Sequence, residues 1–144
     1  MLTGREKIEG AVDQISMNLI QLVKLNEELA NYKVADPNVL DIRKDARLAE
    51  LLDAAVLLRE KILEILNEIE PLVHDEGIVA SAESAIDDLR TLAEYYVYAG
   101  VKADRRIAEK YRGLIVVGGV EGSIADLYNA FRRILDVLGE HGTP

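Results

Sequence analysis

The stretch that decides the fold is residues 36–70, DPNVLDIRKDARLAELLDAAVLLREKILEILNEIE, the longest uninterrupted helical pattern in the chain. Asp36 is a favourable N-cap residue, and Pro37 suits the first helical position, where its missing N–H is not needed. Apolar residues recur three and four positions apart along one helix face: Leu48, Leu51, Ala55, Leu58, Ile62, Ile65 and Ile69. A second apolar set widens that face: Leu52, Val56, Leu57, Leu63 and Leu66. Because a helix this apolar needs neighbours on more than one side, we predict that it is the central helix of a bundle.

The composition fits one domain over residues 1–144, long enough to bury roughly two-thirds of its unfolded surface. Hydrophobic residues make up 49% and charged residues 30%, which excludes general disorder. With one Phe, six Tyr and no Trp, the core must be aliphatic. The net charge of −9 argues against binding nucleic acid or an anionic membrane through the overall field.

The charge is unevenly distributed along the chain. Residues 102–133 carry seven basic side chains against four acidic ones, a local net charge of +3. We therefore assign any anionic ligand to this segment, with Arg105, Arg106, Lys110 and Arg112 as candidate binding residues. The alternative is that these charges only decorate a solvated helix face.

The absence of cysteine excludes a disulfide framework, a thiolate nucleophile and a sulfur metal site. No signal peptide or membrane-spanning run is visible, so the expected location is the cytoplasm, without membrane contact. High charge, an aliphatic core and no cysteine also suit a heat-tolerant host.

The first helix is expected from Thr3 to about Tyr32, because Thr3 and Glu6 have capping-box spacing. Its apolar positions alternate four and three apart, as in a bundle seam: Ile8, Val12, Ile15, Leu19, Leu22 and Leu29. Asn26 takes the remaining seam position. It is either an interface residue that fixes register or oligomeric state, or a residue at the solvent-exposed end of the bundle. Three off-seam residues predict a further contact, such as a second subunit: Ile20, Val23 and Leu25.

The breaks in the remaining chain come from proline and glycine. The central helix should stop or kink at Pro71, with Gly77 as the next terminator. A third helix is expected over 81–99, with Gly100 as its C′ residue. A fourth is expected from 103 through Lys110, extending as far as 117.

The clearest break is at the glycines Gly118, Gly119 and Gly122. The last helix is expected over 123–138, followed by a frayed tail over 139–144. The β-like run 113–119 has no partner strand and is interpreted as a helix end plus a turn. The sequence therefore predicts an all-α fold, an antiparallel up-and-down bundle of about five helices, two long and three shorter.

Few residues are suited to catalysis or metal binding. A carboxylate-bridged metal in a bundle uses Glu-x-x-His pairs, and neither His74 nor His141 has a Glu three residues before it. The glycines near residue 120 match neither a Walker loop nor a dinucleotide motif. We expect no metal, no cofactor and no catalytic residue. A phosphate site at the start of the last helix and a small-ligand enzyme with an internal site remain alternatives.

One acidic group and one aromatic group of residues remain. The glutamates at 60, 64 and 68 form a row of like charges, interpreted as an exposed face that Arg59 and Lys61 help to neutralise. Tyr95 and Tyr98 share one helix side, either as rim residues or as an interface with a subunit or partner.

The last third of the chain, RRIAEKYRGLIVVGGVEGSIADLYNAFRRIL from residue 105, resembles the C-terminal half of HEPN domains that pair with minimal nucleotidyltransferases. That resemblance implies an all-α, dimeric bundle with an RNase motif of Arg, a polar residue and a His. Here the motif Arg is Arg112, while the polar and His positions hold Gly113 and Val117. The resemblance therefore implies a degenerate member without RNase activity, since no general acid or base stands beside Arg112.

The leading hypothesis is a non-catalytic helical-bundle interaction module that dimerises and binds a protein partner, such as a nucleotidyltransferase. The alternative is a nucleotide- or RNA-binding HEPN-like protein that uses the basic strip around Arg112. Salt-dependent binding of RNA would separate the two hypotheses, because phosphate contacts release counterions.

Overall fold

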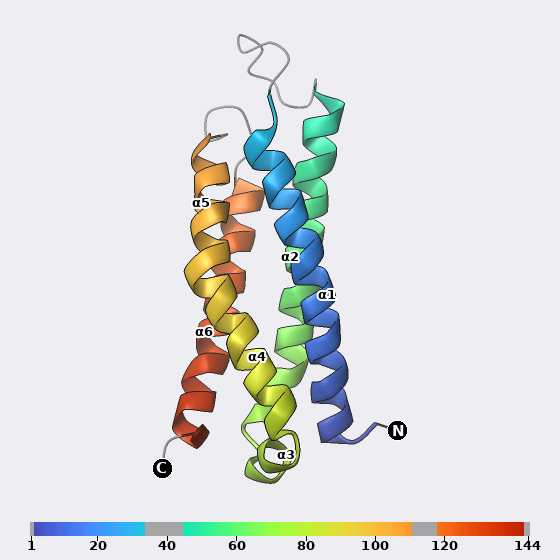
Figure 1. Cartoon of the computed structure of the whole chain (residues 1–144), viewed down its shortest axis with the longest axis vertical. Helices are drawn as coiled ribbons and strands as arrows, with labels where there is room; N and C mark the ends of the chain where they lie inside the picture. Colours follow the sequence, from blue (N-terminus) through green and yellow to red (C-terminus); the bar gives the residue numbers. More distant parts are fainter. Residues whose placement is uncertain (1, 34–44, 111–117, 143–144) are drawn as a thin grey trace.

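The computed structural model describes residues 2–33, 45–110 and 118–142. Figure 1 shows four long helical columns: α1 (Gly4–Asn31) rises, α2 (Ala46–Val73) descends, a column beginning with α4 (Glu83–Tyr95) rises, and α6 (Gly118–Gly142) descends. The short α3 (Glu76–Ser81) and both chain ends lie at one end of the bundle. α1 and α6 each pack against both α2 and the α4 column. The predicted all-α bundle is confirmed.

The start of α1 is as predicted. The Thr3 hydroxyl accepts a hydrogen bond from the Glu6 backbone N–H at 3.2 Å, and the same hydroxyl lies 3.2 Å from the Glu6 carboxylate. Such a cap satisfies one of the free N–H groups of the first turn. The predicted seam residues of this helix are all buried, and Ile20 is exposed while Val23 and Leu25 are half-buried.

α2 begins later than the sequence pattern indicated. Its N-cap is Asp45, whose carboxylate accepts a hydrogen bond from the Leu48 N–H at 3.1 Å. The predicted start at Asp36 and Pro37 lies outside the described residues.

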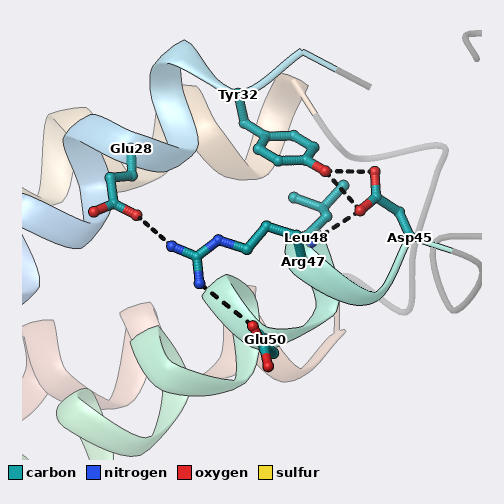
Figure 2. Close-up of polar contacts among 6 residues, drawn as sticks. All are labelled: Glu28, Tyr32, Asp45, Arg47, Leu48 and Glu50. Atoms are coloured by element: carbon teal, nitrogen blue, oxygen red, sulfur yellow. Dashed lines mark hydrogen bonds and ion pairs between the residues drawn. The ribbon is translucent and has the colours of Figure 1, made fainter. Parts of the chain in front are cut away.

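Polar contacts tie the start of α2 to the end of α1 (Figure 2). The Tyr32 hydroxyl lies 2.6 Å from both carboxylate oxygens of Asp45. This hydrogen bond, with that from Leu48, holds the pKa of Asp45 below its usual value. Arg47 lies within 3.3 Å of both Glu28 and Glu50.

Pro71 lies inside α2, which continues to Val73, so the predicted stop is two residues early. Proline removes one helical hydrogen bond and crowds the carbonyl four residues before it, and only two helical residues follow Pro71. Gly77 is not a terminator either, because it lies in the first turn of α3. There the Asp75 carboxylate accepts hydrogen bonds from the N–H groups of Gly77 at 2.9 Å and Ile78 at 3.2 Å.

The predicted break at Gly100 is wrong. α4 passes through one π-helical segment, η2 (Tyr96–Gly100), directly into α5 (Val101–Lys110), and no described glycine has positive φ. A Cβ at Gly100 would lie 3.2 Å from the Tyr96 ring. The glycine is therefore explained by close approach to a buried ring, not by a left-handed turn.

The glycines Gly118, Gly119 and Gly122 lie within α6 rather than ahead of it, and α6 extends through the predicted tail as far as Gly142. With the continuous column α4–η2–α5, the described residues therefore form four long helical columns, where the sequence predicted two long helices. Each glycine costs up to about 1 kcal/mol of helix propensity, which tertiary packing commonly overrides. The rest of the β-like run, 113–117, lies outside the described residues, and the described ranges contain no strand.

The helices share one aliphatic core, as the composition predicted. The predicted apolar faces point inward, with the exception of Leu57, which is exposed. Within the core, the rings of Tyr96 and Phe131 are stacked, with centroids 5.2 Å apart.

Candidate functional site

Four polar side chains form a buried cluster within the bundle. Asn26 comes from α1, Arg59 from α2, Tyr96 from the first position of η2 and Asp104 from α5. Arg59 is 1% exposed and Asp104 is fully buried. Because ionised groups are rarely buried unless they are paired, the contacts within this cluster decide what it can do.

The Asp104 carboxylate is the centre of the cluster. One of its oxygens accepts hydrogen bonds from Arg59 Nη2 and from Asn26 Nδ2, the latter at 2.6 Å. The other oxygen accepts a hydrogen bond from the Tyr96 hydroxyl at 2.8 Å. Arg59 Nη2 also lies 3.5 Å from Asn26 Oδ1. The cluster thereby connects three of the four helical columns.

The electrostatics of the cluster favour a structural role. Burial raises the pKa of the Tyr96 hydroxyl above its usual range, and the adjacent Asp104 charge raises it further. Tyr96 therefore stays protonated and donates to the carboxylate. Arg59 Nε and Nη1 find no acceptor among the described residues. With its charged atoms closed off from solvent, the cluster offers no surface to a substrate.

Two features of the sequence indicate this cluster. Arg59 is four residues after Ala55 and three before Ile62, and Asp104 is three residues from both Val101 and Ile107. Both charged residues thus occupy core positions of their helices. The prediction that Arg59 neutralises the glutamate row is wrong, because its side chain points into the core.

The predicted interface residues separate into two environments. Asn26 is 7% exposed and is bonded within its own chain, so its seam position is used for the polar cluster rather than presented to a second subunit. Tyr95 and Tyr98 are 50% and 70% exposed, whereas Tyr96 between them is buried. The expected shared side of Tyr95 and Tyr98 therefore faces solvent.

The predicted anion-binding residues are not brought together as a site. Arg105 and Arg106 are exposed on α5. Lys110 Nζ donates to the backbone carbonyls of Ala30 at 2.8 Å and Tyr32 at 3.4 Å, where a cation stabilises the C-terminal end of α1. Arg112 lies outside the described residues, as do Gly113 and Val117. Nucleotide or RNA binding at these residues stays a prediction.

A surface groove runs between the first half of α1 and the last half of α2. Its volume is about 460 Å³, and apolar side chains form much of its lining while charged ones lie beside them. The lining consists of Leu2, Glu6, Lys7, Gly10, Ala11, Gln14, Ile65, Glu68, Ile69 and Leu72. Nothing lies within 4 Å of a Cβ placed on Gly10, so this glycine leaves the groove open on the α1 side. The volume is in the range of ligand and side-chain pockets.

The glutamate row Glu60, Glu64 and Glu68 lies on the outer face of α2 and is exposed. Glu68 lines the groove, and all three glutamates line a second hollow of about 400 Å³, together with Leu63 and Asn67. Within the described part of the chain, none of these three carboxylates forms an ion pair. The row therefore carries unneutralised charge next to an apolar depression.

Comparison with known proteins gives no significant match to a protein-family model, a curated protein or a solved structure. The HEPN resemblance therefore stays a prediction. None of the helices in the described ranges combines the length and apolar character that a bilayer crossing requires. Across residues 2–33, 45–110 and 118–142, no three His, Asp or Glu side chains are grouped so that they could hold a metal ion.

Proposed function

We propose that this protein is a non-catalytic helical-bundle interaction module that binds a protein partner in the groove between α1 and α2. The groove of about 460 Å³ carries the proposal, because the half-buried apolar side chains Ile65 and Leu72 line it above the buried Ile69. Grooves of this kind between two helices accept apolar side chains from a partner segment. The polar groups of the interior, by contrast, are occupied with one another.

The partner is a different chain rather than a second copy docked face to face. A two-fold dimer through this surface would place the glutamate row of one protomer beside that of the other. Like charges brought together in this way oppose association. The predicted homodimer would need another surface, for which the exposed Tyr95 and Tyr98 are the candidates.

The experiment fills the groove without disturbing the fold. Gly10→Leu adds a side chain into open space on an exposed helix position, where it also removes the helix-propensity cost of glycine. Gly139→Leu is the matched control, because Gly139 is an exposed α6 glycine with nothing within 4 Å of its Cβ position. Each form is purified gently from its own host and weighed by native mass spectrometry.

We expect one partner chain to accompany the wild type and Gly139→Leu and to be absent from Gly10→Leu. Both variants should unfold at or above the wild-type temperature. The proposal is overturned if the wild type is recovered without a partner, or if Gly10→Leu retains the same partner to the same extent.

A further inference from the structure

We propose that the segment bound in the groove is a basic amphipathic helix, whose apolar face enters the groove while its Lys or Arg side chains contact the glutamate row. This inference rests on the proposed function and names the class of partner. It depends on the juxtaposition of two features: an apolar groove with Glu68 in its lining, and two further carboxylates one and two turns along the same helix.

The first step concerns charge. Glu60, Glu64 and Glu68 are spaced four apart, so neighbouring carboxylates repel one another on one helix face. Arg59, the preceding residue in the chain, is turned into the core and is bonded to Asp104. Lys61, the other neighbouring cation, is exposed and forms no ion pair with the row among the described residues. The row can therefore attract cationic groups from outside, and the chain's net charge of −9 adds to the attraction.

The second step concerns shape. Four residues of an α-helix span about 6 Å, so the row extends over about 12 Å. A partner helix with cations at the same four-residue spacing presents them over the same length. Apolar residues at three- and four-residue spacing on its adjoining face can then reach the groove lined by Ile65, Ile69 and Leu72. A phosphate-rich partner or a second copy of this chain would bring negative charge to the row instead.

The probes are two fluorescent peptides of roughly 18 residues, about five helical turns. Both have the same leucine face. One carries Lys at every fourth position beside that face, and the other carries Glu there. Binding to the full-length protein is measured by fluorescence anisotropy at low and at physiological salt.

The test variant is Glu60→Gln/Glu64→Gln/Glu68→Gln, which removes three charges from the row. The matched control is Asp88→Asn/Glu94→Gln/Asp126→Asn, which removes three charges from exposed positions on α4 and α6. Because the two triple variants have the same net charge, a difference between them reports position rather than long-range attraction.

We expect the Lys peptide to bind the wild type more tightly at low salt than at high salt, and the Glu peptide to bind much more weakly. The row variant should bind the Lys peptide about tenfold more weakly, since each exposed pair contributes only modestly. The control variant should change affinity by less than about twofold.

The inference is overturned if the Lys peptide does not bind, if both peptides bind equally, or if the two triple variants weaken binding equally. These outcomes leave the groove itself open to a partner of other chemistry. Failure of the proposed function is recognised separately, because then Gly10→Leu changes neither peptide binding nor recovery of the host partner.

Discussion

Arg59 and Glu60 are consecutive residues of α2 with opposite surroundings. Arg59 is 1% exposed and is paired with Asp104, 45 residues further along the chain. Glu60 is exposed on the outer face and, with Glu64 and Glu68, has no ion-pair partner among the described residues. One helix thus carries a satisfied charge on its inner side and unsatisfied charges on its outer side.

The buried charge and the exposed charges therefore have different roles: the first stabilises the fold, and the others are available for binding. A buried ion must be paired, because its desolvation costs several kcal/mol, so removing one partner is far more costly than removing an exposed charge. The exposed row contributes no such pairing to the fold. Its charges are available to a partner, and their loss should affect binding rather than stability.

The largest expected effect on stability comes from breaking the buried pair. Arg59→Met should lower the free energy of unfolding by roughly 3–5 kcal/mol, because it leaves the Asp104 charge buried without its cation. Urea unfolding followed by circular dichroism measures this change. Lys61→Met, which removes an exposed cation two residues away, is the control and should change stability by less than about 0.5 kcal/mol.

A double variant tests whether the two buried charges stabilise each other. Arg59→Met/Asp104→Leu should be less destabilised than the sum of the two single variants, because neither charge is then left alone. Additive effects would show that the two side chains do not stabilise one another.

A smaller effect is expected from the Tyr96 hydroxyl. Tyr96→Phe keeps the ring beside Phe131 but removes a donor to Asp104, which should cost about 1–3 kcal/mol near neutral pH. Because burial raises the pKa of Tyr96, its contribution to stability is complete below about pH 10 and is lost as the pH rises above that value.

This pH dependence is tested by measuring the free energy of unfolding at about pH 8 and about pH 11. Between these pH values, Tyr96→Phe should lose less stability than the wild type. Tyr98→Phe, at an exposed position of the same π-helical segment, should behave as the wild type does. An alkaline loss of stability that is unchanged in Tyr96→Phe would contradict the account of the cluster.

Much of the fold could be predicted from the sequence, because helical periodicity alone identifies the inward faces. Leu22 and Leu29 in α1 and Leu127 and Ile134 in α6 are buried as their spacing indicated. The helix ends were less predictable. Gly100 suggested a break, yet it lies in a continuous column, where a side chain would crowd the Tyr96 ring.

The candidate sites could be predicted only in part. The glutamate row is visible in the sequence, since it depends on spacing within one helix. The groove is not, because it requires Gly10 of α1 to lie across from Ile65 and Ile69 of α2. The buried cluster likewise joins residues that are far apart in the chain, such as Asn26 and Asp104.

The smallest effect on stability is expected from Glu60→Gln/Glu64→Gln/Glu68→Gln. This variant is also the most direct test of the difference between the buried charges and the exposed row. The measurement is the free energy of unfolding of this variant beside its affinity for the Lys peptide. We predict stability equal to the wild type or higher by a few tenths of a kcal/mol, because repulsion is relieved, together with weaker binding. A variant that is clearly destabilised while binding as the wild type does would contradict the account.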